Sequence, residues 1–122
     1  MTRILALAAG VVATLAYVST AEAAENRCGW LHNPTPGNYW LTDRDASWTI
    51  LTQGSDVEPD GIENLPDISA GDYVRTNGNY GYACACMGVE VDSGEARILA
   101  IRSFRQLPIS QCRNDASIPA AE

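Results

Sequence analysis

The clearest pattern of apolar and polar positions lies in the second half of the chain. Two runs rich in aromatic, β-branched and other apolar residues, 80–91 and 96–107, flank the polar stretch 92–95. Such a pair of runs predicts a β-hairpin. Pro108 would end its second arm, because proline cannot donate to a strand ladder.

Large and small side chains alternate along the first arm of this hairpin. Successive side chains of a strand point to opposite faces of the sheet, so one face should be bulky and the other small. The step Asn77-Gly78 suits a turn with positive φ, entered by a short strand over 71–76. The bulky face would hold Tyr80, Tyr82, Cys84 and Cys86, and the small face Gly81, Ala83, Ala85 and Met87.

A second hairpin is predicted earlier in the chain. Residues 38–42 and 48–52 are rich in aromatic and β-branched residues, with a polar segment between them. A three-residue loop that pairs Asp43 with Ser47 would place Ala46 in a left-handed conformation, at a cost of about 1 kcal/mol. The same register would put Trp40, Trp48 and Ile50 together on the core face.

The remaining segments show no regular period. Two prolines and a glycine predict an irregular segment over 28–37, and the acidic, proline-broken stretch 53–70 predicts a surface loop. One helical turn is expected from Ser110. These patterns together predict an all-β fold, a small disulfide-stapled antiparallel sandwich or partly open barrel of about five or six strands.

The first residues have the three parts of a secretory signal. Arg3 supplies the positive end, 4–18 is an apolar run, and Ala21-Glu22-Ala23 is a small-residue exit. We predict a signal peptide over 1–23 and a single domain over 24–122, located in the periplasm or secreted. The apolar run is short for a membrane span of about 20 residues, and no span is expected after processing.

Charge narrows the range of partners. The formal net charge is −7, and all eight basic residues are arginines. Phosphate binding draws on clustered positive charge, so nucleic acid and anionic lipid are disfavoured. A basic partner would be favoured instead.

Four cysteines lie in the predicted mature part: Cys28, Cys84, Cys86 and Cys112. An even number in a small exported chain predicts two disulfides. Cys84 and Cys86 should not join each other, because positions i and i+2 of a strand are about 6.5 to 7 Å apart. A metal site or a redox motif built on this cluster is the alternative interpretation.

The hairpin geometry favours one pairing over the other. A turn centred between residues 93 and 94 would place Cys84 opposite Ser103 and Cys86 opposite Ile101. Cys112 would then lie beyond the far end of the second arm, nearer to Cys84 than to Cys86. The predicted bridges are Cys84–Cys112 and Cys28–Cys86, with the crossed arrangement left open.

Several short motifs occur together in a recognisable order. They are Arg27-Cys28-Gly29-Trp30, Asn33-Pro34-Thr35-Pro36, Trp40-Leu41-Thr42-Asp43-Arg44-Asp45, Thr76-Asn77-Gly78-Asn79-Tyr80-Gly81-Tyr82 with Cys84-Ala85-Cys86, and Ser110-Gln111-Cys112-Arg113. In these the chain resembles the small exported bacterial proteins of domain-of-unknown-function family 4087. The resemblance implies an exported, cysteine-containing single domain of bacterial origin. It implies no activity and no catalytic residue.

Residues suited to catalysis are few. His32 is the only histidine, but it lies in a proline-rich segment with no nucleophile motif near it. Asp43 and Asp45 could act as paired carboxylates or bind calcium, although two acids in a hairpin loop are commonly turn formers. No cofactor is expected.

The leading functional hypothesis is a non-enzymatic binding or inhibitor-like module of the bacterial envelope, acting as a monomer. Its partner would be a basic envelope protein or a glycan. Aromatic residues on a disulfide-stapled strand lose little entropy on contact. The alternatives are an envelope enzyme or metal-handling protein using the cysteines or His32, and a structural accessory domain. The predicted binding residues are Trp30, Asn33, Tyr80 and Tyr82.

Overall fold

The computed structural model describes residue 10 and residues 24–121, so the predicted signal peptide and its cleavage site lie outside the described residues. The described chain is mostly strand, which confirms the all-β prediction. The strands are β1 (Glu25–Thr35), β2 (Asn38–Thr42), β3 (Ser47–Leu51), β4 (Val74–Asn77), β5 (Tyr80–Asp92) and β6 (Arg97–Leu107). Three short helices complete the fold: η1 (Ile62–Asn64), η2 (Ile68–Ala70) and α1 (Ile109–Arg113).

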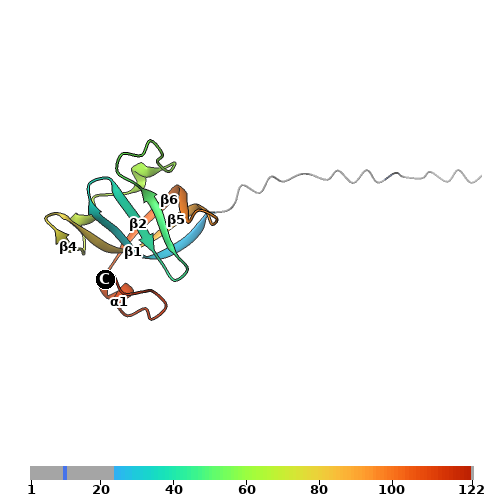
Figure 1. The fold of residues 1–122 in the computed structure, drawn as a ribbon. Coiled ribbons are helices and arrows are strands. Elements are labelled where there is room, and N and C mark those ends of the chain that lie inside the picture. The colour runs from blue at the N-terminus through green and yellow to red at the C-terminus, as the bar shows by residue number, and fades with distance from the viewer. Residues whose placement is uncertain (1–9, 11–23, 122) are drawn as a thin grey trace, which may run out of the picture.

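Five of the strands close into a ring, and Figure 1 shows the resulting barrel. The order is β1-β2-β3-β6-β5, and β5 pairs back to β1. Strand β4 is added on β5, outside the ring. The strand pairs are antiparallel, as predicted, except that β3 and β6 run parallel, so the sheet is mixed. This order, with the third ring strand parallel to the last, is that of the five-stranded Greek-key barrel of the OB type.

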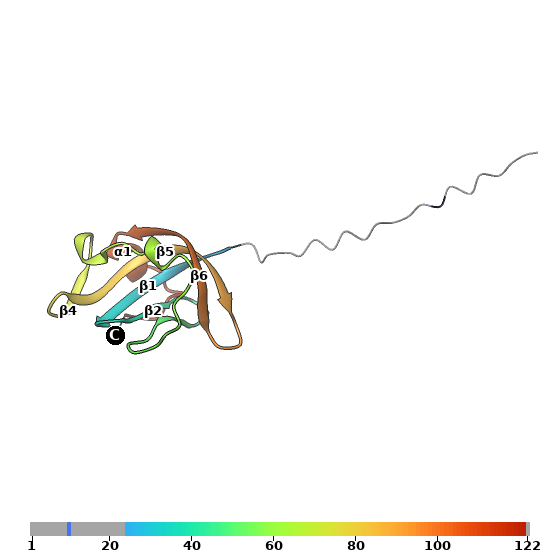
Figure 2. The same cartoon turned by 90° about the horizontal axis from the view of Figure 1, so that it is seen from above.

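Strand β1 contradicts the prediction of an irregular segment over 28–37. It pairs with β5 from Glu25 to Asn33 and with β2 on its other side; β1 and β5 lie side by side in Figure 2. Pro34 is tolerated because it follows the last residue paired with β5 and lies where the β1–β2 register shifts. A proline at such an irregularity removes no ladder hydrogen bond.

The first hairpin has a register one residue away from the predicted one. Its loop is the four-residue turn 43–46, closed by a bond from the Asp43 amide to the Ala46 carbonyl at 3.0 Å. Leu41 therefore lies opposite Trp48, and Trp40 lies opposite Thr49. Because side chains alternate, this slip moves Trp40 from the core to the outer face. Ala46 does not adopt the predicted left-handed conformation. Among the described residues other than glycine, it is Ala96, in the turn of the second hairpin, that has a positive φ, of 49°.

The second hairpin is confirmed as an element, but its predicted register is wrong. Cys84 lies opposite Leu107 rather than Ser103, and Cys86 opposite Arg105 rather than Ile101. Two of the four residues of displacement come from the turn, which is centred between Gly94 and Glu95 because Asp92 pairs with Arg97, and two come from register shifts at residues 88/89 and 90/91. Each bulge adds one residue to one arm, and a strand pattern of apolar residues does not reveal such insertions.

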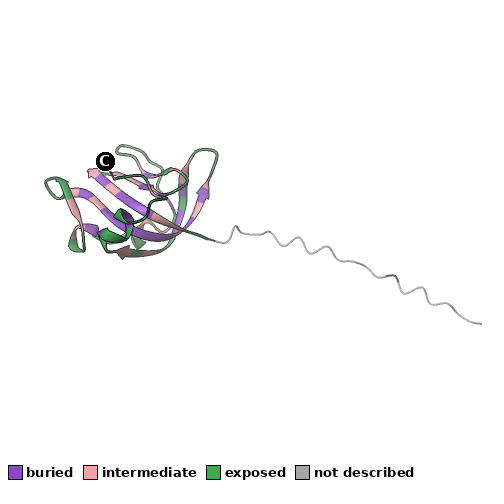
Figure 3. Cartoon of the chain, turned by 90° about the horizontal axis from the view of Figure 1, so that it is seen from below, coloured by how far each residue is buried: buried purple, intermediate pink, exposed green. Residues whose placement is uncertain are grey.

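The alternation along β5 is confirmed, and each face packs a different core. The small face points into the barrel with Ala83, Ala85, Met87 and Val89, beside buried residues of the other strands such as Leu31, Leu41, Ile50 and Ile101. The bulky face packs outside the barrel against α1. That second cluster consists of Trp30, Cys84, Ile109 and Cys112. Figure 3 shows the buried residues concentrated along the strands and the exposed ones in the connecting loops.

Both predicted disulfides are present and use all four cysteines. Cys28–Cys86 joins directly opposed residues of β1 and β5, whose Cα atoms are 4.0 Å apart. Cys84–Cys112 joins β5 to α1 over a Cα distance of 5.8 Å. The predicted helical turn in the tail is confirmed by α1, which this bridge fastens to the barrel. Two structural disulfides in so small a chain indicate an oxidising environment.

Candidate binding face

Three aromatic side chains form one row across the outer face of β5, β1 and β2. His32 lies directly opposite Tyr82 on one side and Trp40 on the other. The His32 ring stacks on the Trp40 indole, with ring centres 5.3 Å apart and planes 22° apart. Its centre lies 5.6 Å from that of the Tyr82 ring. We call Tyr82, His32 and Trp40 the aromatic row.

The aromatic row is half-buried and held on rigid backbone. Each of its three side chains is partly exposed, and each comes from a paired strand. Gly29 lets β1 approach β2 closely, because a Cβ at that position would overlap the carbonyl oxygen of Thr42. The row is therefore pre-organised, which lowers the entropy lost when a ligand binds.

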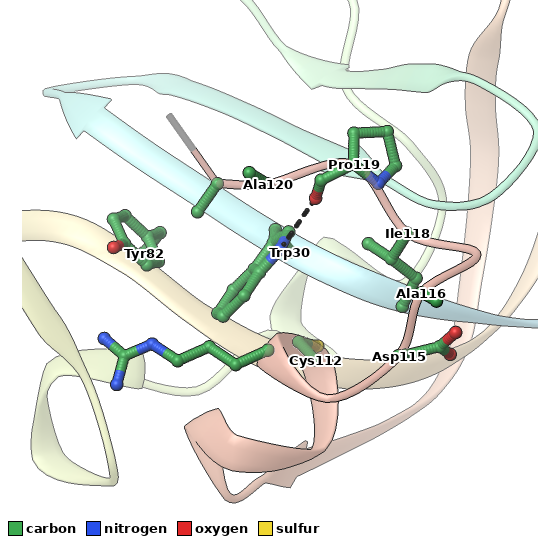
Figure 4. A pocket seen from close by; sticks show the side chains of 10 residues that line it. Trp30, Tyr82, Cys112, Asp115, Ala116, Ile118, Pro119 and Ala120 are labelled. Atoms are coloured by element: carbon green, nitrogen blue, oxygen red, sulfur yellow. Dashed lines mark hydrogen bonds between the residues drawn. The ribbon is translucent and has the colours of Figure 1, made fainter.

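Trp30 extends the row beneath the C-terminal segment. Its ring meets that of Tyr82 edge to face, with centres 5.2 Å apart. The Trp30 side chain is only 2% exposed, because the chain after α1 crosses it and the Pro119 carbonyl accepts a 3.1 Å hydrogen bond from its Nε1. Figure 4 shows this contact beside a pocket of about 350 Å³ that Tyr82 and Ile118 also line.

A second pocket lies at the other end of the row. It has a volume of about 360 Å³ and covers the outer face of β2 and β3, with Trp40 and Thr49 in its lining. The two pockets thus flank the aromatic row, one at Tyr82 and one at Trp40.

Two of the four predicted binding residues lie elsewhere. Asn33 is 7% exposed, and its amide donates to the carbonyls of Thr35 and Asn38 at 3.0 and 2.9 Å, so it fixes the β1–β2 turn. Tyr80 begins β5 and, among the described residues, makes no ring contact with the row. The structure therefore brings together Trp30 and Tyr82 of the predicted set.

Tyr80 is near a separate pair of phenols. Burial raises the pKa of Tyr39 and of Tyr73, and in each case Tyr80 and Asp67 contribute to the shift. The Tyr73 hydroxyl donates to the Asn79 carbonyl at 3.0 Å. These contacts fasten the turn between β4 and β5.

An ion cluster lies around the first hairpin loop. The Arg27 guanidinium contacts Asp43 at 2.9 Å, Asp45 at 3.0 Å and Glu25 at 2.8 Å, and lies 4.2 Å from the centre of the Trp48 ring. Burial works to raise the pKa of Asp43, but bonds from Arg27, two backbone amides and Trp48 outweigh it and lower that pKa. The two predicted aspartates are thus turn formers joined to a structural ion pair.

The cysteines and His32 are the residues on which a metal site or a catalytic role would depend. All four cysteines are in disulfides, so none supplies a thiolate. In the part of the chain that the structure describes, no group of three or more His, Cys, Asp or Glu side chains is placed to hold a metal ion. His32 lies between the rings of Trp40 and Tyr82. No helix among the described residues is long and apolar enough to span a membrane.

Comparison with known proteins identifies the family. Residues 22–119 match the family described as "Protein of unknown function (DUF4087)". The chain belongs to this family. No curated protein and no solved structure matches the chain significantly. The DUF4087 match covers the whole barrel, both disulfides and most of the C-terminal segment.

Sequence reasoning missed two members of the row. His32 was expected in an irregular segment and Trp40 in the core, yet both lie on the outer face of this DUF4087 barrel. The signal that could have found His32 is the alternation of faces along a strand: with β1 as a strand, His32 shares a face with Trp30 and Cys28. The face on which Trp40 lies depends on the length of the hairpin loop, and no pattern in the sequence indicates that length.

Proposed function

We propose that this DUF4087 protein is a non-enzymatic binding module whose binding surface is the aromatic row. The observation that carries the proposal is the unbroken ring-to-ring contact from Trp40 through His32 to Tyr82 on a disulfide-fastened sheet. Rigid aromatic side chains that are half-exposed are typical anchors of binding surfaces. OB-type barrels commonly bind on the face of their second and third strands, which here carries Trp40 and the pocket beside it; this supports the Trp40 end of the row by fold analogy alone.

The proposed site of action is the periplasm or the cell exterior. The secretory signal expected over 1–23 and the two disulfides favour export to an oxidising compartment. Partners in that compartment would be a basic envelope protein or a glycan, because the net charge of −7 disfavours polyanions.

The experiment is capture from envelope extract by the immobilised, oxidised protein. Bound material is analysed both for protein, by mass spectrometry, and for sugar, after acid hydrolysis. We expect Tyr82→Ala to reduce capture at least severalfold. The matched control is Leu99→Ala, because Leu99 is an apolar residue 48% exposed on β6 and outside both pockets. Equal capture by wild type and Tyr82→Ala would refute the proposal.

The enzymatic alternative has a test of its own. His32 would be its acid or base, so turnover of an envelope substrate by wild type but not by His32→Gln would replace the binding proposal. The glutamine keeps a polar side chain of similar reach while removing the titratable ring.

A further inference from the structure

The pocket beside Trp40 has an aromatic wall. His32 comes from β1 and stacks on the indole from that side, whereas the pocket lies over β2 and β3. One face of the Trp40 ring is therefore covered by His32, and the other is turned toward the pocket. A flat or weakly curved apolar surface of a ligand would find a matching wall there.

The rest of the lining is rich in hydroxyl groups. Thr49 and Thr52 line the pocket, and within residues 24–121 their hydroxyls make no hydrogen bond. Asn38 and Ser47 are further polar residues of the same lining. These groups can each donate and accept hydrogen bonds to a polar ligand.

The pocket holds no charge. None of the residues that line it is acidic or basic, in a chain with a net charge of −7. An ionic ligand would lose hydration there without an opposite charge to compensate. The occupant that fits is uncharged, with an apolar face and several hydroxyls at its edge.

We propose that this pocket binds an uncharged sugar ring of a glycan, stacked on Trp40 and hydrogen-bonded by Thr49 and Thr52. A pyranose ring has this combination of groups, because its C–H bonds form apolar faces and its hydroxyls project from the rim. The pocket volume of about 360 Å³ suits a ligand of this size class. This inference rests on the proposed function and names the ligand class of the same face.

The test uses oligosaccharides of four to six residues built from glucose, mannose or N-acetylglucosamine, titrated into the oxidised protein. Binding is measured by calorimetry and by tryptophan fluorescence. We expect saturable binding of at least one of them. Loss of the tryptophan anchor in Trp40→Ala should weaken it at least about tenfold, and loss of one hydroxyl in Thr49→Val about three- to tenfold. Leu99→Ala should bind as wild type does.

Three results would overturn the inference. Absence of saturable binding to every uncharged oligosaccharide would exclude the ligand class, while capture lost in Tyr82→Ala would still support the proposed function. Capture of a basic protein that Trp40→Ala abolishes, without sugar binding, would replace the glycan by a protein partner. Unchanged sugar affinity in both Trp40→Ala and Thr49→Val, each with a cooperative unfolding transition, would exclude this pocket as the site.

Discussion

Replacing Asp43 by asparagine should remove one charged contact from the loop of the first hairpin and leave its shape intact. The Asp43 side chain is buried, and its Oδ1 accepts from Trp48 Nε1 at 3.0 Å and from the amides of Asp45 and Ala46 at 2.9 and 3.0 Å. An asparagine oxygen can accept the same three bonds. Its amide nitrogen, however, would face the Arg27 guanidinium, which now donates to Oδ2 at 2.9 Å.

The expected loss is that of one charge-assisted hydrogen bond in a nearly buried position, about 2 to 3 kcal/mol of unfolding free energy at pH 7. Arg27 keeps Glu25 and Asp45 as partners, so the guanidinium is not left unpaired. This limits the cost to less than that of a stranded buried charge, which is roughly 3 to 5 kcal/mol.

The unfolding free energy lost in Asp43→Asn should also depend on pH, and it should become smaller as the pH falls. The pKa of Asp43 is lowered in the folded protein, where burial opposes the ionised form but the Arg27, backbone and Trp48 bonds outweigh it. A lowered folded pKa stabilises the fold above the unfolded pKa of about 4 and loses this effect as pH falls through the folded value. The difference between wild type and Asp43→Asn should therefore be full at pH 5 to 7 and shrink below pH 4.

Urea unfolding followed by tryptophan fluorescence, at steps from pH 7 to pH 2.5, measures this difference. Asp45→Asn is the matched control, because Asp45 contacts the same guanidinium but its side chain is 57% exposed. Its cost should stay below about 1 kcal/mol. A cost for Asp43→Asn that is below 0.5 kcal/mol, on the order of the surface-pair range, or that is constant with pH, would refute the reasoning.

Three further predictions concern the scaffold. Gly29→Ala should lower the free energy of unfolding by about 3 kcal/mol, because its Cβ would overlap the Thr42 carbonyl; Gly94→Ala, where a Cβ meets only ordinary contact, should be near neutral in the same urea assay. Replacing Cys84 and Cys112 together by alanine should cost roughly 3.5 kcal/mol, from the chain entropy of a loop with a sequence separation of 28; a cost below about 1 kcal/mol would contradict this. Ending the chain after residue 114 removes the cover of Trp30 and should shift tryptophan emission to longer wavelength, with about 1 kcal/mol of stability lost for its hydrogen bond; an unchanged spectrum would show that the segment does not shield the ring.

Composition and alternation were enough to predict the fold class and both hairpins. The bridges followed from the order of the cysteines along the strands, because Cys84 lies nearer the end of β6 than Cys86 in the predicted and the observed register alike. Parity along β5 is a local property of the chain. The predicted alternation of faces along β5 is therefore correct, although the pairing of β5 with β6 shifts at two bulges between the turn and the cysteines.

The parts that failed depend on non-local geometry. Pro34 argued against a strand, yet β1 tolerates it because neither neighbouring ladder needs its missing amide. Trp40 was expected in the core, because loops of three and four residues both fit the sequence and differ by one residue in register. The aromatic row also depends on non-local geometry, because it forms only when β1 lies between β5 and β2. The sequence alone therefore did not predict it.

The spacing of the cysteines has a consequence for oxidative folding. Cys86 faces Cys28, and Cys84 faces Trp30, so the two neighbouring thiols differ by a slip of two residues of β5 against β1. Such a slip keeps every side chain on its own face, and the hydrophobic pattern therefore discriminates poorly between the native bridge and a Cys28–Cys84 bridge. A chain oxidised in the slipped register would leave Cys112 to pair with Cys86. All four cysteines would then be bonded, so an external thiolate would have to open one bridge, and be released again at the end, for both bridges to exchange to the native pairing.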